Sequence, residues 1–159
     1  MFLYRGVAKE LHEKNSGRLK PKGEGDKFTH MFNPSEHLYP SGSIFPGECE
    51  QNAVVTHQFD ELRTEQKFRS AGISTTPIFE RAKYYATHTH INVNELVTTD
   101  GYVYVIDRNK LDKFEIEQKI VSELVEFPRH PEDEEVILVA KDRGDLPIEI
   151  VVETREVTP

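Results

Sequence analysis

The sequence predicts an α+β fold with two packed antiparallel or mixed sheets and short flanking helices. Runs rich in β-branched and aromatic residues at 101–107 (GYVYVID), 134–140 (EEVILVA) and 147–153 (PIEIVVE) are typical of strands. Helix-forming stretches lie mainly in the first half of the chain. Because 159 residues suit one hydrophobic core, we expect a single domain over 1–159.

The first elements follow from local composition. Residues 2–7 (FLYRGV) predict a strand, and 8–15 (AKELHEKN) predict a short helix before the stop signal Ser16-Gly17. Residues 18–47 are rich in Gly, Pro, Ser and Lys without a period, which predicts a long surface loop. Apolar residues three and four positions apart then predict a helix within 52–66.

The later elements are a helix and several strands. Residues 71–76 (AGISTT) predict a strand, and Pro77 opens a helix over 78–87 with Thr76 as its N-cap. We expect residues 101–107 to form a central strand. The last two strand-like runs are separated by a turn containing Gly144, so we expect them to form a hairpin or a close relative of one.

Charge and hydropathy limit the function classes. Twenty basic against twenty-eight acidic residues give a net charge of −8, which excludes general electrostatic binding to nucleic acid. No apolar run is long enough to span a membrane, and no signal-peptide pattern opens the chain. We therefore expect a soluble monomer, either cytoplasmic or a secreted or translocated effector.

Four separated features could carry chemistry: Arg5 with Tyr4 and Gly6, His57, the run 74–76 (STT), and the acidic segment 130–136 (HPEDEEV). Each has an ordinary structural explanation. Ser and Thr before Pro commonly cap helices, and acidic clusters commonly form solvated turns. Their order along the chain is more informative than any one of them.

Taken in that order, these features resemble the ADP-ribosyltransferase family, in the cholera-toxin-like class with an Arg, a Ser-Thr-Ser strand and a Glu-x-Glu turn. The opening 3–5 (LYR), the helix after it and the turn 17–23 (GRLKPKG) are similar to the start of enterotoxin A subunits. His57 precedes Ser74 by seventeen residues, a spacing similar to that in the enterotoxins. The likeness extends from residue 3 to about 139.

The resemblance implies an NAD cleft between the two sheets and mono-ADP-ribosyl transfer to a protein acceptor with release of nicotinamide. Breaking the nicotinamide bond passes through an oxocarbenium-like ribosyl cation, which a fixed carboxylate stabilises. The resemblance assigns this role to Glu135, held by Ser74. It assigns NAD binding to six residues: Tyr4, Arg5, Gly6, His57, Thr75 and Thr76.

The acidic turn departs from the family pattern. Anchoring its register on Glu135-Val136 places Asp133 where the first Glu of Glu-x-Glu stands, one methylene shorter. We expect Asp133 to orient or deprotonate the acceptor, with Glu132 and Glu134 as substitutes. The resemblance also places a target-reading loop at 113–129, although Ile116, Ile120 and Leu124 there could equally line an amphipathic helix.

Three alternatives stay open. The same site could transfer ADP-ribose to water as an NAD glycohydrolase, or the fold could bind a nucleotide without catalysis. A more distant alternative is a cupin-like metal protein, because His88, His90 and Glu95 are similar to the first cupin metal motif. The second cupin motif is missing, so we predict no metal, with the two histidines at a helix end and in a loop.

Overall fold

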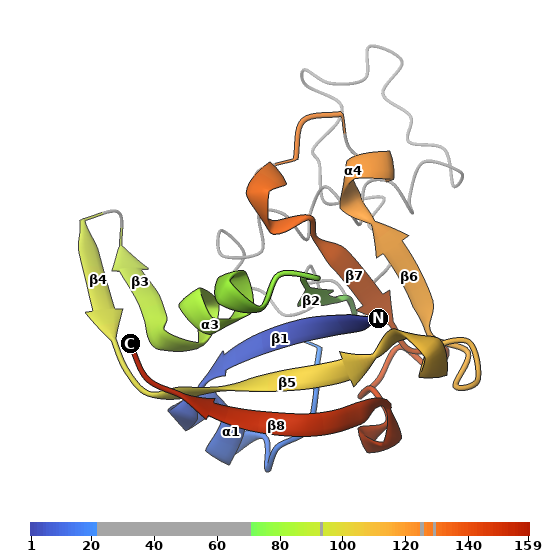
Figure 1. Cartoon of the computed structure of the whole chain (residues 1–159), viewed down its shortest axis with the longest axis horizontal. Coiled ribbons are helices and arrows are strands. Elements are labelled where there is room, and N and C mark those ends of the chain that lie inside the picture. Colours follow the sequence, from blue (N-terminus) through green and yellow to red (C-terminus); the bar gives the residue numbers. More distant parts are fainter. Residues whose placement is uncertain (22–70, 93, 125, 129) are drawn as a thin grey trace, which may run out of the picture.

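The computed structural model describes residues 1–21, 71–92, 94–124, 126–128 and 130–159. In this part of the chain the fold is α+β, as expected, with three small antiparallel sheets and few helices (Figure 1). The strand orders are β1-β5-β8, β2-β7-β6 and β3-β4. The first two sheets enclose the main core, and the third is a hairpin that projects beyond α3.

The strands are β1 (Phe2–Ala8), β2 (Ile73–Thr75), β3 (His88–Asn92), β4 (Glu95–Thr98), β5 (Gly101–Asp107), β6 (Glu117–Ile120), β7 (Val136–Val139) and β8 (Val151–Val157). The α-helices are α1 (Lys9–Lys14), α3 (Phe79–Thr87) and α4 (Val121–Leu124). Three short 3-10 helices in the described residues are η4 (Arg108–Lys110), η5 (Pro131–Asp133) and η6 (Ile148–Ile150).

Strand β5 lies at the centre of the first sheet, as its β-branched and aromatic composition predicted. It pairs with β1 along its whole length on one side and with β8 on the other. Helix α3 packs on one face of this sheet, where Gly6 lies against Ala82 and Gly101 lies against Ala86. A Cβ atom at Gly6 would stand 1.8 Å from the Ala82 carbonyl oxygen, so the glycine permits this close approach.

Strand β7 lies at the centre of the second sheet, and all four of its residues are buried. Alternate side chains face opposite sides of a strand. Val136 and Leu138 accordingly join the main core, whereas Ile137 and Val139 belong to a second cluster with Val121. Burial on both faces explains the unbroken apolar run VILV.

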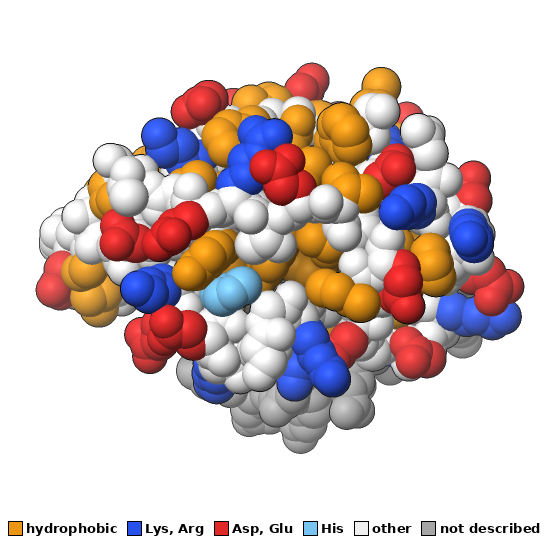
Figure 2. Space-filling model, turned by 60° about the horizontal axis from the view of Figure 1, so that its bottom comes forward, with side chains coloured by type: hydrophobic (Ala, Val, Ile, Leu, Met, Phe, Trp, Pro, Cys, Tyr) orange, Lys and Arg blue, Asp and Glu red, His pale blue; other side chains and the backbone are white. Residues whose placement is uncertain are grey.

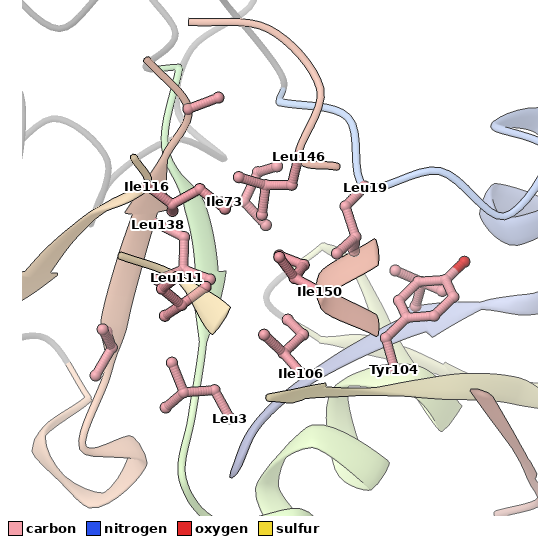
Figure 3. Packing of buried hydrophobic residues seen from close by; sticks show 13 residues of the cluster. Leu3, Leu19, Ile73, Tyr104, Ile106, Leu111, Ile116, Leu138, Leu146 and Ile150 are labelled. Atoms are coloured by element: carbon pink, nitrogen blue, oxygen red, sulfur yellow. The ribbon is translucent and has the colours of Figure 1, made fainter. Parts of the chain in front are cut away.

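The main core fills the space between the first two sheets (Figure 3). Leu3 and Ile106 from the first sheet meet Ile73 and Leu138 from the second, and all four are at most 3% exposed. Each such side chain contributes about 1.5–3 kcal/mol through burial. The expected packing of two sheets is therefore present, and the β3-β4 hairpin is an addition that the sequence did not predict.

The predicted C-terminal hairpin is wrong. Strand β7 pairs with β2 and β6, whereas β8 pairs with β5 in the other sheet. Between them, η6 inserts Ile150, which is fully buried in the core between the sheets. Side chains along the middle of β8 are exposed, unlike those of β7, so the two strands occupy different environments.

The amphipathic helix that Ile116, Ile120 and Leu124 allowed within 113–129 is also wrong. Strand β6 occupies the middle of this stretch and pairs with β7, and among the described residues of the stretch only the four of α4 form an α-helix. A spacing of four residues is a multiple of the strand period of two as well as close to one helical turn. The same apolar pattern therefore fits both structures.

Smaller differences concern element ends. His88 is the C-cap residue of α3, at a helix end as expected, and it also begins β3, whereas His90 lies in β3 rather than in a loop. Helix α3 begins at Phe79, with Ile78 as its N-cap residue, although the Thr76 hydroxyl does accept a hydrogen bond from the Ile78 N–H at 3.0 Å. Most of the loop predicted over 18–47, and the whole helix predicted over 52–66, lie outside the described residues.

The surface carries charges of both signs. On the face shown in Figure 2, acidic and basic side chains are interspersed, with hydrophobic side chains between them. Among the helices of the described residues, none combines the length and the apolar character needed to cross a membrane.

Candidate active site

The two sheets are joined beside the predicted site. Tyr4 of β1 and Thr76, just after β2, exchange two backbone hydrogen bonds of 2.8 and 3.0 Å as an isolated antiparallel bridge. This bridge brings the start of the chain next to the strand that carries Ser74. Residues about seventy positions apart in the sequence thereby share one edge of the core.

Arg5 points toward the space between the sheets. It follows Leu3 and precedes Val7 by two residues, and both neighbours belong to the main core on the same face of β1. Its Nη1 atom donates a hydrogen bond of 3.1 Å to the backbone carbonyl of Ser74. Desolvation by burial lowers the pKa of Arg5, and the nearby carboxylate of Glu135 opposes this change.

Ser74 lies on β2, and Glu135 lies just before the neighbouring strand β7. The register pairs Ser74 with Ile137 and Thr75 with Val136, and Glu135 directly precedes Val136. By strand alternation, Ser74 and Ile137 face the same side of this sheet. Glu135 is half-buried, and its backbone carbonyl accepts a hydrogen bond of 3.1 Å from the Val121 N–H.

The two threonines after Ser74 hold the acidic segment in place. The Thr75 hydroxyl donates to the Val136 carbonyl at 2.6 Å, and the Thr76 hydroxyl donates to the Asp133 carbonyl at 2.5 Å. Both threonine residues are buried. Their hydroxyls therefore fix the backbone on either side of Glu135.

Asp133 is buried, with 7% of its surface exposed, and both of its carboxylate oxygens are engaged. Oδ1 accepts a hydrogen bond of 2.6 Å from Nε of Arg81, and Oδ2 accepts one from the Tyr85 hydroxyl. The bond to Asp133 raises the pKa of Arg81. Burial raises the pKa of the Tyr85 hydroxyl, as does its bond to Asp133. Both partners project from α3.

The other acidic side chains of the turn are exposed. The Glu132 carboxylate lies 3.6 Å from Nη2 of Arg81 and 3.5 Å from Nδ1 of His130. A hydrogen bond to its own backbone, with smaller contributions from His130 and Arg81, lowers the pKa of Glu132. Glu134 is exposed, and its φ of 48° places it in the left-handed region. This bend separates Asp133 from Glu135.

The remaining predicted site residues are distributed as follows. Tyr4 packs edge-to-face on Phe79 with ring centroids 5.5 Å apart, and Gly6 contacts Ala82, so both lie on the α3 face of β1. This is the face opposite Arg5. His57 lies outside the described residues.

A hollow beside Arg5 is lined by two further cations, Arg18 and Lys20, together with Asn15. Its cavity volume is about 10 Å³, so it is a shallow hollow open to solvent. Three cationic side chains around one hollow, in a chain with a net charge of −8, form a local environment that favours an anion.

The histidines of the metal alternative have other neighbours. His88 Nδ1 lies 2.8 Å from the Thr87 hydroxyl, and His90 Nε2 lies 3.4 Å from the Tyr84 hydroxyl. Across the described ranges, no three His, Cys, Asp or Glu side chains gather closely enough to hold a metal ion.

Sequence reasoning missed Arg81 and Tyr85. The signal available was their spacing of four residues on one predicted helix, which places both side chains on the same face. That spacing does not identify Asp133 as their shared partner, because the contact spans about fifty residues.

Comparison with known proteins shows the family of this chain. No curated protein matches the chain. The model of the family named NarE matches residues 2–138, which include β1, the strand with Ser74 and the acidic turn. The match covers most of the 159 residues, and the chain belongs to the NarE family.

Proposed function

We propose that this protein is a mono-ADP-ribosyltransferase that cleaves NAD, releases nicotinamide and transfers ADP-ribose to a protein side chain. The observation that carries the proposal is the position of Arg5 where the two sheets join, bonded to the backbone carbonyl of Ser74 and interacting electrostatically with Glu135. These residues come from three separate segments and belong to the motifs on which the resemblance to ADP-ribosyltransferases rests.

Glu135 supplies the fixed negative charge that the reaction needs. Loss of nicotinamide leaves positive charge on the ribose, and a carboxylate held nearby stabilises that charge. The hydrogen bonds from the Val121 N–H to the Glu135 carbonyl and from the Thr75 hydroxyl to the Val136 carbonyl limit movement of the segment that carries the carboxylate. A positioned carboxylate acts without reorganisation cost during the reaction.

Arg5 positions the substrate NAD rather than reacting with it. Its guanidinium has the planar fork of donors suited to phosphate oxygens. The hollow beside it, with Arg18 and Lys20, offers further positive charge toward the two phosphates of the dinucleotide. A strongly acidic chain that gathers cations at one hollow is consistent with an anionic substrate there.

Hydrolysis of NAD is the second candidate. Both carboxylate oxygens of Asp133 are already bonded to Arg81 and Tyr85, although the resemblance gives this position to acceptor recognition. If no other group recruits a protein acceptor, water takes the ribosyl group instead. The same Glu135 chemistry serves both outcomes.

The test is nicotinamide release from NAD by the purified protein, alone and with a cell lysate, beside the Glu135→Gln variant. This substitution removes one charge while keeping the side-chain shape, so release should fall by at least about a hundredfold with the fold intact. The matched control is Glu149→Gln, at an exposed position in η6, which should keep wild-type release.

Labelling of lysate proteins would identify the transferase, and release without labelling would identify the glycohydrolase. Release that is unchanged in Glu135→Gln would refute the catalytic assignment. Binding of NAD with no release under either condition would favour the nucleotide-binding alternative.

A further inference from the structure

Asp133 is buried and is held by four hydrogen bonds. Its carboxylate accepts hydrogen bonds from Arg81 and Tyr85, and its backbone carbonyl accepts one from the Thr76 hydroxyl. Its backbone N–H donates to the His130 carbonyl at 3.1 Å. Each carboxylate oxygen and both backbone groups of Asp133 therefore have a hydrogen-bond partner.

The identity of the partners matters. Burial disfavours a charged carboxylate, and a cation with a directed N–H bond compensates that cost. Arg81 supplies the cation, and Tyr85 supplies a neutral donor whose raised pKa keeps its proton in place. Because both residues lie on α3, the helix and the acidic turn are tied together.

Glu135 is two residues further along the same turn. The Glu134 N–H bonds to the Pro131 carbonyl at 3.2 Å, and Glu134 then bends the chain in the left-handed region. With Asp133 anchored before this bend and Thr75 bonded to Val136 after it, little freedom remains for Glu135. A displacement of about 1 Å in a catalytic group can cost about a hundredfold in rate.

We propose that Asp133 is a positioning residue: clamped by Arg81 and Tyr85, it holds the turn that presents Glu135, and it does not contact the acceptor. The inference rests on the proposed function for its effect on rate. It differs from the role that the resemblance implies for this position, which is contact with the acceptor nucleophile. In this protein the carboxylate of Asp133 contacts Arg81 and Tyr85 of α3 instead of an acceptor.

The experiment compares Arg81→Met, Tyr85→Phe and Asp133→Asn in NAD hydrolysis without any acceptor. For a positioning role, Arg81→Met and Asp133→Asn should each lower kcat by about tenfold to a hundredfold, with KM for NAD within about twofold of wild type. Tyr85→Phe should have a smaller effect, because it removes one neutral bond. The Arg81→Met/Asp133→Asn pair should be no worse than Arg81→Met alone, since both changes break one contact.

The control is Lys141→Met, which breaks the exposed ion pair with Glu115 (2.9 Å) beyond the opposite end of β7 and should leave kcat unchanged. If Asp133 instead contacts the acceptor, the opposite results are expected. Under it, Asp133→Asn would keep acceptor-free hydrolysis and lose only labelling of lysate proteins, and Arg81→Met would have wild-type kcat. Either result would overturn the proposal.

A measurement independent of activity separates this inference from the proposed function. Amide hydrogen exchange at Glu134 and Val121 reports on the turn, because the Val121 N–H bonds to the Glu135 carbonyl. Exchange at both amides should become faster in Arg81→Met and, less so, in Tyr85→Phe, and not in Lys141→Met. A wild-type protein that releases no nicotinamide would refute the proposed function, whereas unchanged exchange in Arg81→Met would refute the clamp.

Discussion

Arg5 and Ser74, 69 positions apart in the chain, are joined by a hydrogen bond of 3.1 Å from the arginine Nη1 atom to the serine carbonyl. The bond holds the half-buried guanidinium near Glu135. An arginine on an apolar strand is ordinarily solvated at the tip of its side chain. Here burial lowers the pKa of Arg5, and the nearby carboxylate of Glu135 partly opposes this change.

Replacement of Arg5 should weaken NAD binding. Arg5→Ala removes the charged fork, and Arg5→Lys keeps the charge without the planar donors, so we expect KM for NAD to rise by about tenfold or more in both. Steady-state nicotinamide release measures it. Arg155→Lys, at an exposed pair with Glu153 on β8, is the control. An unchanged KM in Arg5→Ala would place phosphate binding elsewhere.

Substitution of Gly6 should displace α3. A Cβ at this position would stand 1.8 Å from the Ala82 carbonyl oxygen and 2.9 Å from the Ala86 nitrogen, and both atoms are backbone. We expect Gly6→Ala to destabilise the fold by about 2 kcal/mol or more, measured by urea denaturation.

The control for this substitution is Gly144→Ala, where the nearest atom is the end of the Asp142 side chain at 3.2 Å. That side chain can rotate away, so the control should lie within about 0.5 kcal/mol of wild type. Equal stability of Gly6→Ala and Gly144→Ala would contradict the close packing of α3 on β1.

Loss of the Thr76 hydroxyl should loosen the acidic turn. Thr76→Val keeps the side-chain shape but leaves the buried Asp133 carbonyl and the Ile78 N–H without this partner. We expect a loss of about 1–3 kcal/mol in the free energy of unfolding. Thr154→Val, an exposed threonine on β8, should change it little. A Thr76→Val variant as stable as Thr154→Val would show that the hydroxyl bond to the turn contributes nothing.

The contribution of Tyr85 to the stability of the fold should decrease at alkaline pH. Burial raises the pKa of its hydroxyl above the ordinary value of 10.0, so the folded state keeps a proton that the unfolded state loses. The stability that this group contributes is therefore complete below about pH 10 and falls as pH rises further. The stability difference between wild type and Tyr85→Phe should shrink above pH 10, as measured by urea denaturation at each pH. A difference that stays constant from pH 8 to pH 11 would contradict this assignment.

Several elements could be predicted because their signals are local. The strand at 2–7, the helix at 8–15 and the strand at 101–107 correspond to β1, α1 and β5 within one or two residues at each end. Their composition, capping and turn residues act within a few positions of the chain. Such signals do not depend on what the element later contacts.

The partner of each strand could not be predicted in the same way. The runs 134–140 and 147–153 both indicate strands, and their short separation favoured a hairpin. The choice of β2 and β6 for one run, and β5 for the other, depends on which faces are buried once the sheets pack. That information is distributed over the whole core.

By itself, the amino-acid sequence determined the α+β class, several of the strand-forming segments and the candidate residues Arg5, Ser74 and Glu135, because residue type and spacing carry those signals. Only the tertiary structure decided that β7 and β8 lie in different sheets, that Arg5 bonds to Ser74, and that Arg81 and Tyr85 bind Asp133. The physical reason is distance along the chain. Contacts between residues 48 to 69 positions apart form only when burial of the shared core offsets the loss of chain entropy.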